Sequence, residues 1–374
     1  MVRQQADSTI GIPVSLCAAI YPSNLIPMCD LSLFFFSNYE VDANNKYELL
    51  LECVKYADQN GFAAVWTPER HFHEFGGLFP NPSVVSAALA MITENITLRS
   101  GSVVSPLHDV IRIAEEWSVV DNLSKGRIAL SFASGWNGHD FVLAKDNFRN
   151  RHEIMYEQIA TLKHLWNGGT VQRENGVGKE ITIRMFPEPY NKDLPVWITA
   201  SRHDETFIRA GEIGANLLTH MLGQEIAELS RKIGLYRDAR RRNGFDPAAG
   251  KVAVMLHTFV HDDEDFVMNT VSEPFLNYLK SSADLDKFLY EDAGQTREQL
   301  SPEVQEEMLR AYMLYYISQA SLIGTTDHAT EMMSKLADAG VNEIACLIDF
   351  GIDPALVLAG LRNLKVLNGA LQAS

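Results

Sequence analysis

The chain is poor in cysteine, has no excess of positive charge and contains no long uninterrupted hydrophobic run. Its 374 residues include only four cysteines, which lie far apart and form no CxxC pair: Cys17, Cys29, Cys53 and Cys346. This spacing excludes a disulfide framework and a cysteine-based zinc site. It favours a reducing compartment, so we expect a cytoplasmic protein.

The charge balance and the N-terminal sequence exclude further classes. A formal net charge of −16 disfavours a nucleic-acid-binding protein, which needs a basic face, and adhesion to anionic membranes. The apolar stretch from Ile10 to Met28 is interrupted by Pro13, Pro22 and Pro27, so it does not predict a membrane helix. It also lacks the basic start and cleavage site of a secretory leader. We expect residues 1–29 to form an irregular extension and residues 30–374 to form one domain.

What the sequence does contain is an alternation of strand-like and helix-like segments. The strand candidates are short apolar runs at residues 31–36, 63–67, 97–104, 127–132, 195–199, 215–219, 252–260 and 343–348. Helical periodicity is found at residues 46–60, 82–92, 149–166, 204–212, 225–243 and 326–339, and from residues 108 and 354 onward. Eight such units predict an α/β fold, a (β/α)8 TIM barrel. A doubly wound sheet is the alternative, but no GxGxxG motif follows any of the strands.

Two segments interrupt this alternation. Residues 170–194 form an excursion after the fourth helix, which we expect to contain a hairpin because Ile181, Thr182 and Ile183 favour a strand. Residues 262–320 form an acidic, helix-rich insertion between strands seven and eight. We expect this insertion to act as a lid over the site, with bracing or disorder as alternatives.

Charged residues gather directly after the second predicted strand. Glu69, Arg70, His71 and His73 follow the apolar run that ends at Thr67. Packing alone explains such a cluster poorly, because charged residues are rarely buried unless they are paired. In a barrel of this kind the chemistry lies at the carboxyl ends of the strands. We therefore select Glu69, Arg70 and His71 as candidate catalytic residues.

Other strand ends offer candidates for cofactor binding. Gly101 and Ser102 lie inside the third strand, where a glycine marks a bulge, a simple kink, or the close approach of a ligand such as a flat isoalloxazine ring. Ser134 follows the fourth strand and His220 follows the sixth. These positions would converge on one mouth of the barrel.

An anion site is predicted after the fifth strand. Ala200, Ser201 and Arg202 lead into a helix whose N-terminus offers free N–H groups and the positive end of its dipole. Arg151, at the start of the long fourth helix, could bind phosphate in a bidentate manner. Ordinary N-capping by Ser201 or Asp204 is the alternative.

These residues together resemble the bacterial-luciferase-like flavin monooxygenases. The luciferase α-subunit carries Glu-His-His-Phe-Thr-Glu-Phe-Gly after its second strand, where this chain has Glu69-Arg70-His71-Phe72-His73-Glu74-Phe75-Gly76. Further similar stretches lie at residues 104–108, 112–115, 123–127, 195–201 and 324–348. Residues 67–72, 133–136 and 209–215 are most similar to a subgroup encoded with polyketide and nonribosomal-peptide assembly lines.

The resemblance implies a monooxygenase of natural product biosynthesis. It implies a homodimeric TIM barrel that receives reduced FMN (FMNH2) from a separate flavin reductase and adds O2 to form a flavin C4a-peroxide. That species would oxygenate a secondary-metabolite intermediate, either free or bound to a carrier protein. Hydroxylation and insertion beside a carbonyl both stay open, as does the identity of the substrate.

The resemblance also assigns roles to individual residues. His71 matches the second histidine of the motif, which implies contact with the flavin or its peroxide and a part in acid–base chemistry. Glu69 would orient Arg70 or the loop. Arg70 replaces the first histidine and could hold a peroxide anion or a substrate carboxylate. Because the luciferase arginine after strand four aligns with Ser134, the phosphate charge would fall to Arg151 and Arg202.

Three alternatives stay open. An F420-dependent oxidoreductase of the same fold would use a similar site. A metal-dependent barrel hydrolase could draw its ligands from His71, His73, His220, His257 and Asp349. A flavin-binding subunit without activity is the alternative that is not an enzyme.

Overall fold

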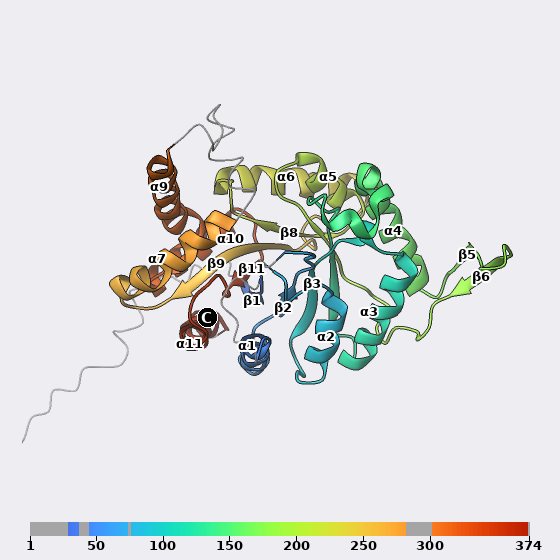
Figure 1. Ribbon diagram of the computed structural model, residues 1–374, viewed down its shortest axis with the longest axis horizontal. Coiled ribbons are helices and arrows are strands. Elements are labelled where there is room, and N and C mark those ends of the chain that lie inside the picture. Colours follow the sequence, from blue (N-terminus) through green and yellow to red (C-terminus); the bar gives the residue numbers. More distant parts are fainter. Residues whose placement is uncertain (1–28, 37–44, 74–75, 282–300, 373–374) are drawn as a thin grey trace, which may run out of the picture.

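Short strands buried on both faces close into a parallel barrel. The computed structural model describes residues 29–36, 45–73, 76–281 and 301–372. The barrel strands are β1 (Asp30–Phe34), β2 (Ala64–Thr67), β3 (Thr97–Val103), β4 (Ile128–Phe132), β7 (Val196–Thr199), β8 (Asn216–His220), β9 (Val252–Val260) and β11 (Glu343–Leu347). They pair in the order β9-β11-β1-β2-β3-β4-β7-β8, and a parallel pairing of β8 with β9 closes the ring (Figure 1).

The prediction of a (β/α)8 barrel is confirmed, and the doubly wound alternative is wrong. An open sheet has two edge strands, whereas here Leu217 pairs with Val252 and leaves the eight-stranded ring without an edge. Each predicted strand overlaps an observed one. Most of the strands are rich in apolar residues because helices cover the outside of a parallel sheet and side chains fill its inside.

Helices surround the barrel in the expected alternation. They are α1 (Glu48–Gln59), α2 (Pro82–Ala90), α3 (Val110–Ser124), α4 (Arg151–Trp166), α5 (Asp204–Glu212), α6 (Ile226–Arg242), α10 (Thr326–Asp338) and α11 (Pro354–Gln372). Local chemistry sets their ends: Asn81 caps α2 by accepting from the Ser83 and Val84 N–H groups, ahead of Pro82 at the first helical position. No helix in the described ranges combines the length and the hydrophobicity that a membrane span requires.

The two interruptions have different structures. The predicted hairpin is confirmed: β5 (Thr170–Glu174) pairs antiparallel with β6 (Glu180–Arg184) and projects from the barrel (Figure 1). The insertion contains α7 (Glu264–Ser281) and α9 (Pro302–Ala320), which pack against each other beside β9. A short strand that we did not predict, β10 (Leu322–Gly324), pairs with the end of β9. The linker between α7 and α9 and residues 1–28 of the extension predicted at residues 1–29 lie outside the described residues.

A buried ion pair fills the barrel near the amino-terminal ends of its strands. Arg99 on β3 donates from Nη1 to both carboxylate oxygens of Glu343 on β11, at 2.8 and 2.7 Å. The guanidinium lies 4.7 Å from the ring centroid of Trp66 and 4.8 Å from that of Trp197. These side chains fill the barrel interior at the amino-terminal ends of the strands. A ligand would therefore enter the barrel from the carboxyl ends.

Candidate active site

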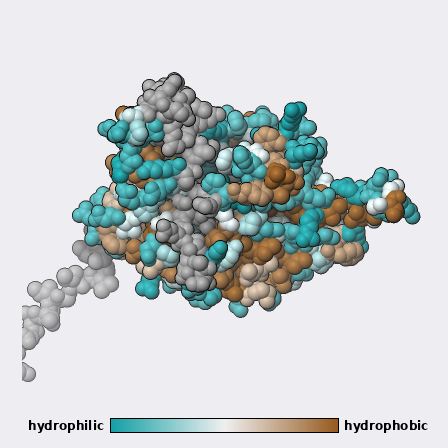
Figure 2. Space-filling view, in the orientation of Figure 1, coloured by the Kyte–Doolittle hydropathy of each residue, from teal (hydrophilic) through white to brown (hydrophobic). Residues whose placement is uncertain are grey.

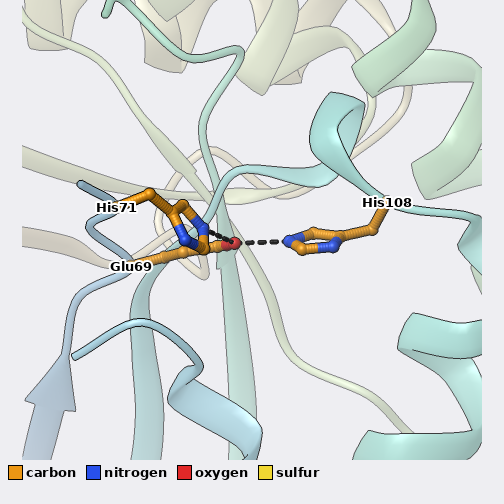
Figure 3. A group of neighbouring side chains, drawn as sticks. All are labelled: Glu69, His71 and His108. Carbon is orange, nitrogen blue, oxygen red and sulfur yellow. Dashed lines mark hydrogen bonds and ion pairs between the residues drawn. The ribbon is translucent and has the colours of Figure 1, made fainter. Parts of the chain in front are cut away.

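Glu69 is the centre of a hydrogen-bonded cluster at the carboxyl end of the barrel. The loop after β2 carries Glu69 into the interior, where the residue is 6% exposed. Its Oε1 accepts from His71 Nε2 at 2.9 Å and from His108 Nε2, and its Oε2 accepts from the Val104 N–H at 2.7 Å (Figure 3). The cluster therefore joins the loops that follow β2 and β3.

Electrostatics favour an ionised Glu69 and a protonated His108. Burial opposes the charge of Glu69, but the hydrogen bonds from His108, His71 and the Val104 N–H outweigh it and lower the pKa of the carboxyl. Burial likewise opposes the charge of His108, yet its bond to Glu69 and the negative charge there raise the pKa of the imidazole. The contact between Glu69 and His108 therefore favours the charged form of both residues.

The same contacts define which His71 nitrogen can take part in chemistry. An ionised carboxylate only accepts hydrogen bonds, so Nε2 of His71 must carry the hydrogen that points to Glu69. In a neutral ring the lone pair then lies on Nδ1. His71 is thereby prepared to accept a proton on the side turned away from Glu69.

Glu69 and His71 were predicted from the sequence as catalytic residues, and His108 was not. A three-residue 3-10 helix, Ser105–Leu107, follows β3 and turns the chain so that His108 faces Glu69. The stretch that ends in His108 resembles the family, and this was the signal that could have identified it. His73 is exposed and lies outside the cluster of Glu69, His71 and His108.

Arg70, the third candidate catalytic residue, lies beside this cluster between two aromatic rings. Its guanidinium carbon is 5.7 Å from the ring centroid of Phe36 and 5.3 Å from that of Trp136. Asp140 is an additional acid here: burial raises the pKa of its carboxyl, although Arg70 and His71 nearby act in the opposite direction.

The irregularity predicted at Gly101 and Ser102 is confirmed. The pairing of β3 with β4 shifts its register between Ser100 and Val103, and the Gly101–Ser102 peptide bond is cis. A Cβ on Gly101 would lie 2.9 Å from Phe34 Cε2, so only glycine fits. Ser102 Oγ hydrogen-bonds Thr199 Oγ1, which also lies 2.9 Å from Ser131 Oγ. This group of hydroxyls from β3, β4 and β7 was not predicted.

The helix start after β7, where an anion site is predicted, carries Asp204 and Glu205 in its first turn. His203, not Ser201 or Asp204, is the N-cap of α5, and its own side chain makes no capping bond. The capping alternative is therefore wrong. Arg231 binds both carboxylate oxygens of Asp204, at 2.7 and 2.8 Å, which neutralises this acidic residue in the first turn. Ala200 is buried, whereas Arg202 is exposed.

Residues of both charges lie at the starts of α4 and α5, where Arg209 binds both carboxylate oxygens of Glu153 at 2.7 and 3.1 Å. Burial lowers the pKa of His152, and the positive charges of Arg151, His203 and Arg209 lower it further. Arg151 itself donates from Nε to the Gly135 carbonyl at 2.8 Å and from Nη1 to the Phe148 carbonyl at 2.9 Å. It therefore holds the loop after β4, a role that the prediction of a bidentate phosphate contact did not include.

The last two candidates for cofactor binding lie at the ends of two other strands. Ser134 and His220 are both half-buried, at the ends of β4 and β8.

The predicted metal ligands of a barrel hydrolase do not lie together in the structure. His257 is buried with Nδ1 3.0 Å from the Tyr316 hydroxyl, and Asp349 Oδ1 accepts the Phe36 N–H at 2.7 Å. Among the described residues, only Glu69, His71 and His108 lie close enough to share a metal ion.

Comparison with known proteins identifies the family. The sequence model of the luciferase-like monooxygenases matches residues 30–343, most of the chain. The chain belongs to the luciferase-like monooxygenase family. It is thus a flavin-dependent monooxygenase by class, and the hydrolase alternative is wrong.

Individual relatives of the family are distant in sequence. The oxygenase component of the flavin-dependent trigonelline monooxygenase of Acinetobacter baylyi is 24% identical over 316 residues, which cover 82% of this chain and 84% of that protein. The oxygenating constituent of 3,6-diketocamphane monooxygenase from Pseudomonas putida, solved with FMN, has a TM-score of 0.72 at 16% identity and covers 90% of this chain and 97% of its own. An F420-dependent secondary alcohol dehydrogenase has a TM-score of 0.66 at 14% identity, with 92% and 99% covered. Both solved structures are similar to this chain in fold.

Proposed function

We propose that this luciferase-like monooxygenase uses reduced FMN and O2 to oxygenate a secondary-metabolite intermediate. The observation that carries the proposal is the cluster of Glu69, His71 and His108 at the carboxyl end of the barrel, where the irregularity of β3 at Gly101 and the N-terminus of α5 also lie. The three features supply a proton-transfer group, a surface for a flat ring and a phosphate site. A natural product as substrate rests on the resemblance of residues 67–72 and 133–136.

The described residues fit FMN. The α5 N-terminus with Ser201 and Arg202, together with Arg151 and His203 beside it, would hold the phosphate. Gly101 would let the ring approach the β3 backbone, with Ser102, Ser134 and His220 around it. Reduced FMN, when bound, supplies the electrons for the reduction of O2.

The chain's own groups then manage protons and water. His71 accepts a proton at Nδ1 and returns it in a later step, as a general base and then acid. Glu69 fixes the ring and the tautomer of His71, and so acts as a positioning residue. His108 hydrogen-bonds the same Glu69 oxygen and, in its protonated form, balances the charge of this buried carboxylate. The buried barrel interior keeps bulk water from the site.

Two partners belong to the proposal. One is a flavin reductase that supplies FMNH2, because the trigonelline relative is named as an oxygenase component. The other is a second copy of the chain, bound through α2 and α3. The exposed residues Val84, Met91, Val119 and Leu123 form an apolar surface over these helices, between 42 and 69% exposed (Figure 2). Such a patch favours association.

F420 is the second candidate cofactor, favoured by the fold likeness to an F420-dependent dehydrogenase. Anaerobic titration of the protein with reduced FMN and with reduced F420 tests the choice. We expect tight binding of FMN, about tenfold weaker binding in the variant His203→Glu because of charge repulsion, and no such loss in the control His139→Glu. Tighter binding of F420 than of FMN would contradict the proposal.

A flavin-binding subunit without activity would also bind FMN in that titration. Turnover separates the two: an enzyme consumes O2 and forms an oxygenated product when a reductase and a substrate are supplied. Tight FMN binding without product formation across a broad set of substrates would support the subunit.

A further inference from the structure

We propose that a cavity at the amino-terminal end of the barrel binds a small molecule that carries phosphate groups. The cavity has a volume of about 650 Å³ and lies between the last turns of α4 and α6, beside the first residues of β7 and β8. Small-molecule sites have volumes of about 300–1,000 Å³. Since the catalytic candidates lie at the carboxyl ends of the strands, this cavity is a separate site.

The lining of this cavity carries three cations and one acid. Lys163 comes from the last turn of α4, Lys192 from the loop before β7, and Arg240 from the last turn of α6. Asp193 is the acid. The whole chain has a formal net charge of −16, so this local excess of positive charge is opposite in sign to the chain as a whole. A concave surface with such an excess attracts anions.

Arg240 is buried without a negatively charged partner. The residue is 5% exposed. Its Nε donates to the Asp246 carbonyl at 3.0 Å, and its Nη1 donates to the Ala215 carbonyl at 3.0 Å and the Tyr236 hydroxyl at 3.4 Å. Within the described part of the chain, no carboxylate pairs with this guanidinium and no acceptor faces Nη2, which is not enclosed and is therefore open to the cavity. Because buried charges are normally paired, a bound anion would supply the missing charge.

Close packing fixes the orientation of the Arg240 guanidinium. Its carbon lies 5.6 Å from the ring centroids of both Tyr236 and Phe245. A Cβ at Gly250 would lie 2.2 Å from the Tyr236 hydroxyl and 2.8 Å from Arg240 Cδ, so only glycine fits beside this side chain. An arginine held in one orientation loses little freedom when it binds an oxyanion.

Lys163 is a second cation with unused donors. Its side chain is half-buried and donates no hydrogen bond to the residues that the structure describes. Burial lowers the pKa of its ammonium group, and the negative charge of Asp193 acts in the opposite direction. Lys192 Nζ lies 3.1 Å from Glu188 Oε2 in an exposed pair, a kind of contact that contributes little. Both lysines can therefore contribute charge to a ligand.

Stabilisation of the helix ends does not explain these cations. Basic residues in a last turn often bind the free carbonyls of their own helix. Arg240 instead donates to the carbonyls of Ala215 and Asp246, which lie outside α6. Lys163 donates to no carbonyl in the described ranges. An arginine edge together with a lysine point charge is the combination that binds phosphate.

The size and polarity of the cavity define the ligand further. A single phosphate ion would fill only part of the volume, so the ligand is larger than the inorganic ion. Asn167 and Asn216 add amide groups to the lining, which favours a hydrophilic molecule. The ligand class is therefore a small, water-soluble phosphorylated compound.

Calorimetric titration of the full chain with inorganic pyrophosphate tests this site. The buffer is free of magnesium and constant in ionic strength, and saturating oxidised FMN occupies the proposed flavin phosphate site. Citrate is the comparison probe, because its charge is spread over three separate carboxylates. We expect one pyrophosphate to bind per chain, about tenfold more tightly than citrate.

Two pairs of variants assign the binding to the cavity. Ala249→Glu places a negative charge on an exposed residue of the cavity wall, so it should weaken pyrophosphate binding about tenfold by charge repulsion. Ala248→Glu is the matched control, exposed and one position away but outside the lining. Lys163→Met should weaken binding about tenfold as well, whereas Lys179→Met, at an exposed position of the β5–β6 hairpin, should not.

Four results would overturn the proposal: no binding of pyrophosphate, equal binding of citrate, equal affinities of Ala249→Glu and Ala248→Glu, or loss of pyrophosphate binding when FMN is added. The last would assign pyrophosphate to the flavin site. Failure of FMN to bind would contradict the proposed function alone, because the two alanine variants test the cavity without FMN.

Discussion

His71 donates from Nε2 to Oε1 of Glu69 across 2.9 Å, although the two residues are separated by only one position in the chain. The Glu69 side chain is 1% exposed and the His71 side chain is 10% exposed. The pair therefore couples the buried negative charge of Glu69 to a largely buried imidazole at the carboxyl end of the barrel. The expected loss of activity in His71 variants follows from this contact. The expected pH dependence of stability follows from the contact that Glu69 makes with His108.

Replacement of His71 by glutamine should abolish most of the activity. Glutamine can still donate to Glu69, but it offers no nitrogen that accepts and returns a proton. We expect kcat to fall about 10²- to 10⁴-fold while the affinity for reduced FMN changes little. His73→Gln is the matched control, since His73 is exposed two positions further on. An equal loss in both variants would argue against a specific role for His71.

The charged pair of Glu69 and His108 should make stability depend on pH. The pKa of His108 is raised in the folded protein, so its contribution is complete below the ordinary histidine pKa of about 6.5 and is lost as the pH rises through the raised value. The lowered pKa of Glu69 keeps that residue ionised throughout this window.

The free energy of unfolding, measured by urea titration, tests this coupling. The deficit of His108→Gln relative to the unaltered protein should be larger at pH 6 than at pH 9. His139→Gln, at an exposed position, serves as the control. A deficit that is constant over this range would show that His108 contributes through packing alone.

Glu343→Gln should destabilise the barrel strongly. The substitution leaves the Arg99 guanidinium, which is 6% exposed, without its charged partner. We expect a loss of about 3–5 kcal/mol in the free energy of unfolding, which is typical of a broken buried ion pair. The double variant Arg99→Met/Glu343→Leu should recover part of the loss. A single variant within about 1 kcal/mol of the unaltered protein would contradict this.

The proposed homodimer can be tested at the apolar surface of α2 and α3. Met91→Glu and Val119→Glu each place a charge on an exposed apolar position, so they should shift sedimentation from dimer toward monomer at micromolar concentration. Val177→Glu, at the tip of the β5–β6 hairpin, is the control. Unchanged sedimentation of all three variants would place the interface elsewhere.

The sequence predicted those features that lie within one short segment. Most barrel strands were recognisable because they are short apolar runs between helix-like segments, and Glu69 and His71 were recognisable because they follow one strand directly. β10 was missed because Leu322, Ile323 and Gly324 are too few to show a period. The fold thus followed from local patterns repeated along the chain.

The rest of the site depends on which strands become neighbours. His108 joins Glu69 only because β2 pairs with β3, and Thr199 joins Ser102 and Ser131 only because β3, β4 and β7 are adjacent. No spacing in the sequence reveals such pairs. The roles predicted for Gly101, Ser134, Arg151, Ala200, Ser201, Arg202 and His220 stay predictions until a cofactor is bound.

Stopped-flow absorbance of the protein with reduced FMN, mixed with oxygenated buffer, measures whether the protein controls the reaction of the flavin with O2. We expect a flavin transient that outlives the oxidation of free FMN and shortens in His71→Gln but not in His73→Gln. Reoxidation at the rate of free FMN under conditions where reduced FMN is shown to be bound, with no effect of His71→Gln on rate or product in the presence of substrate, would contradict it.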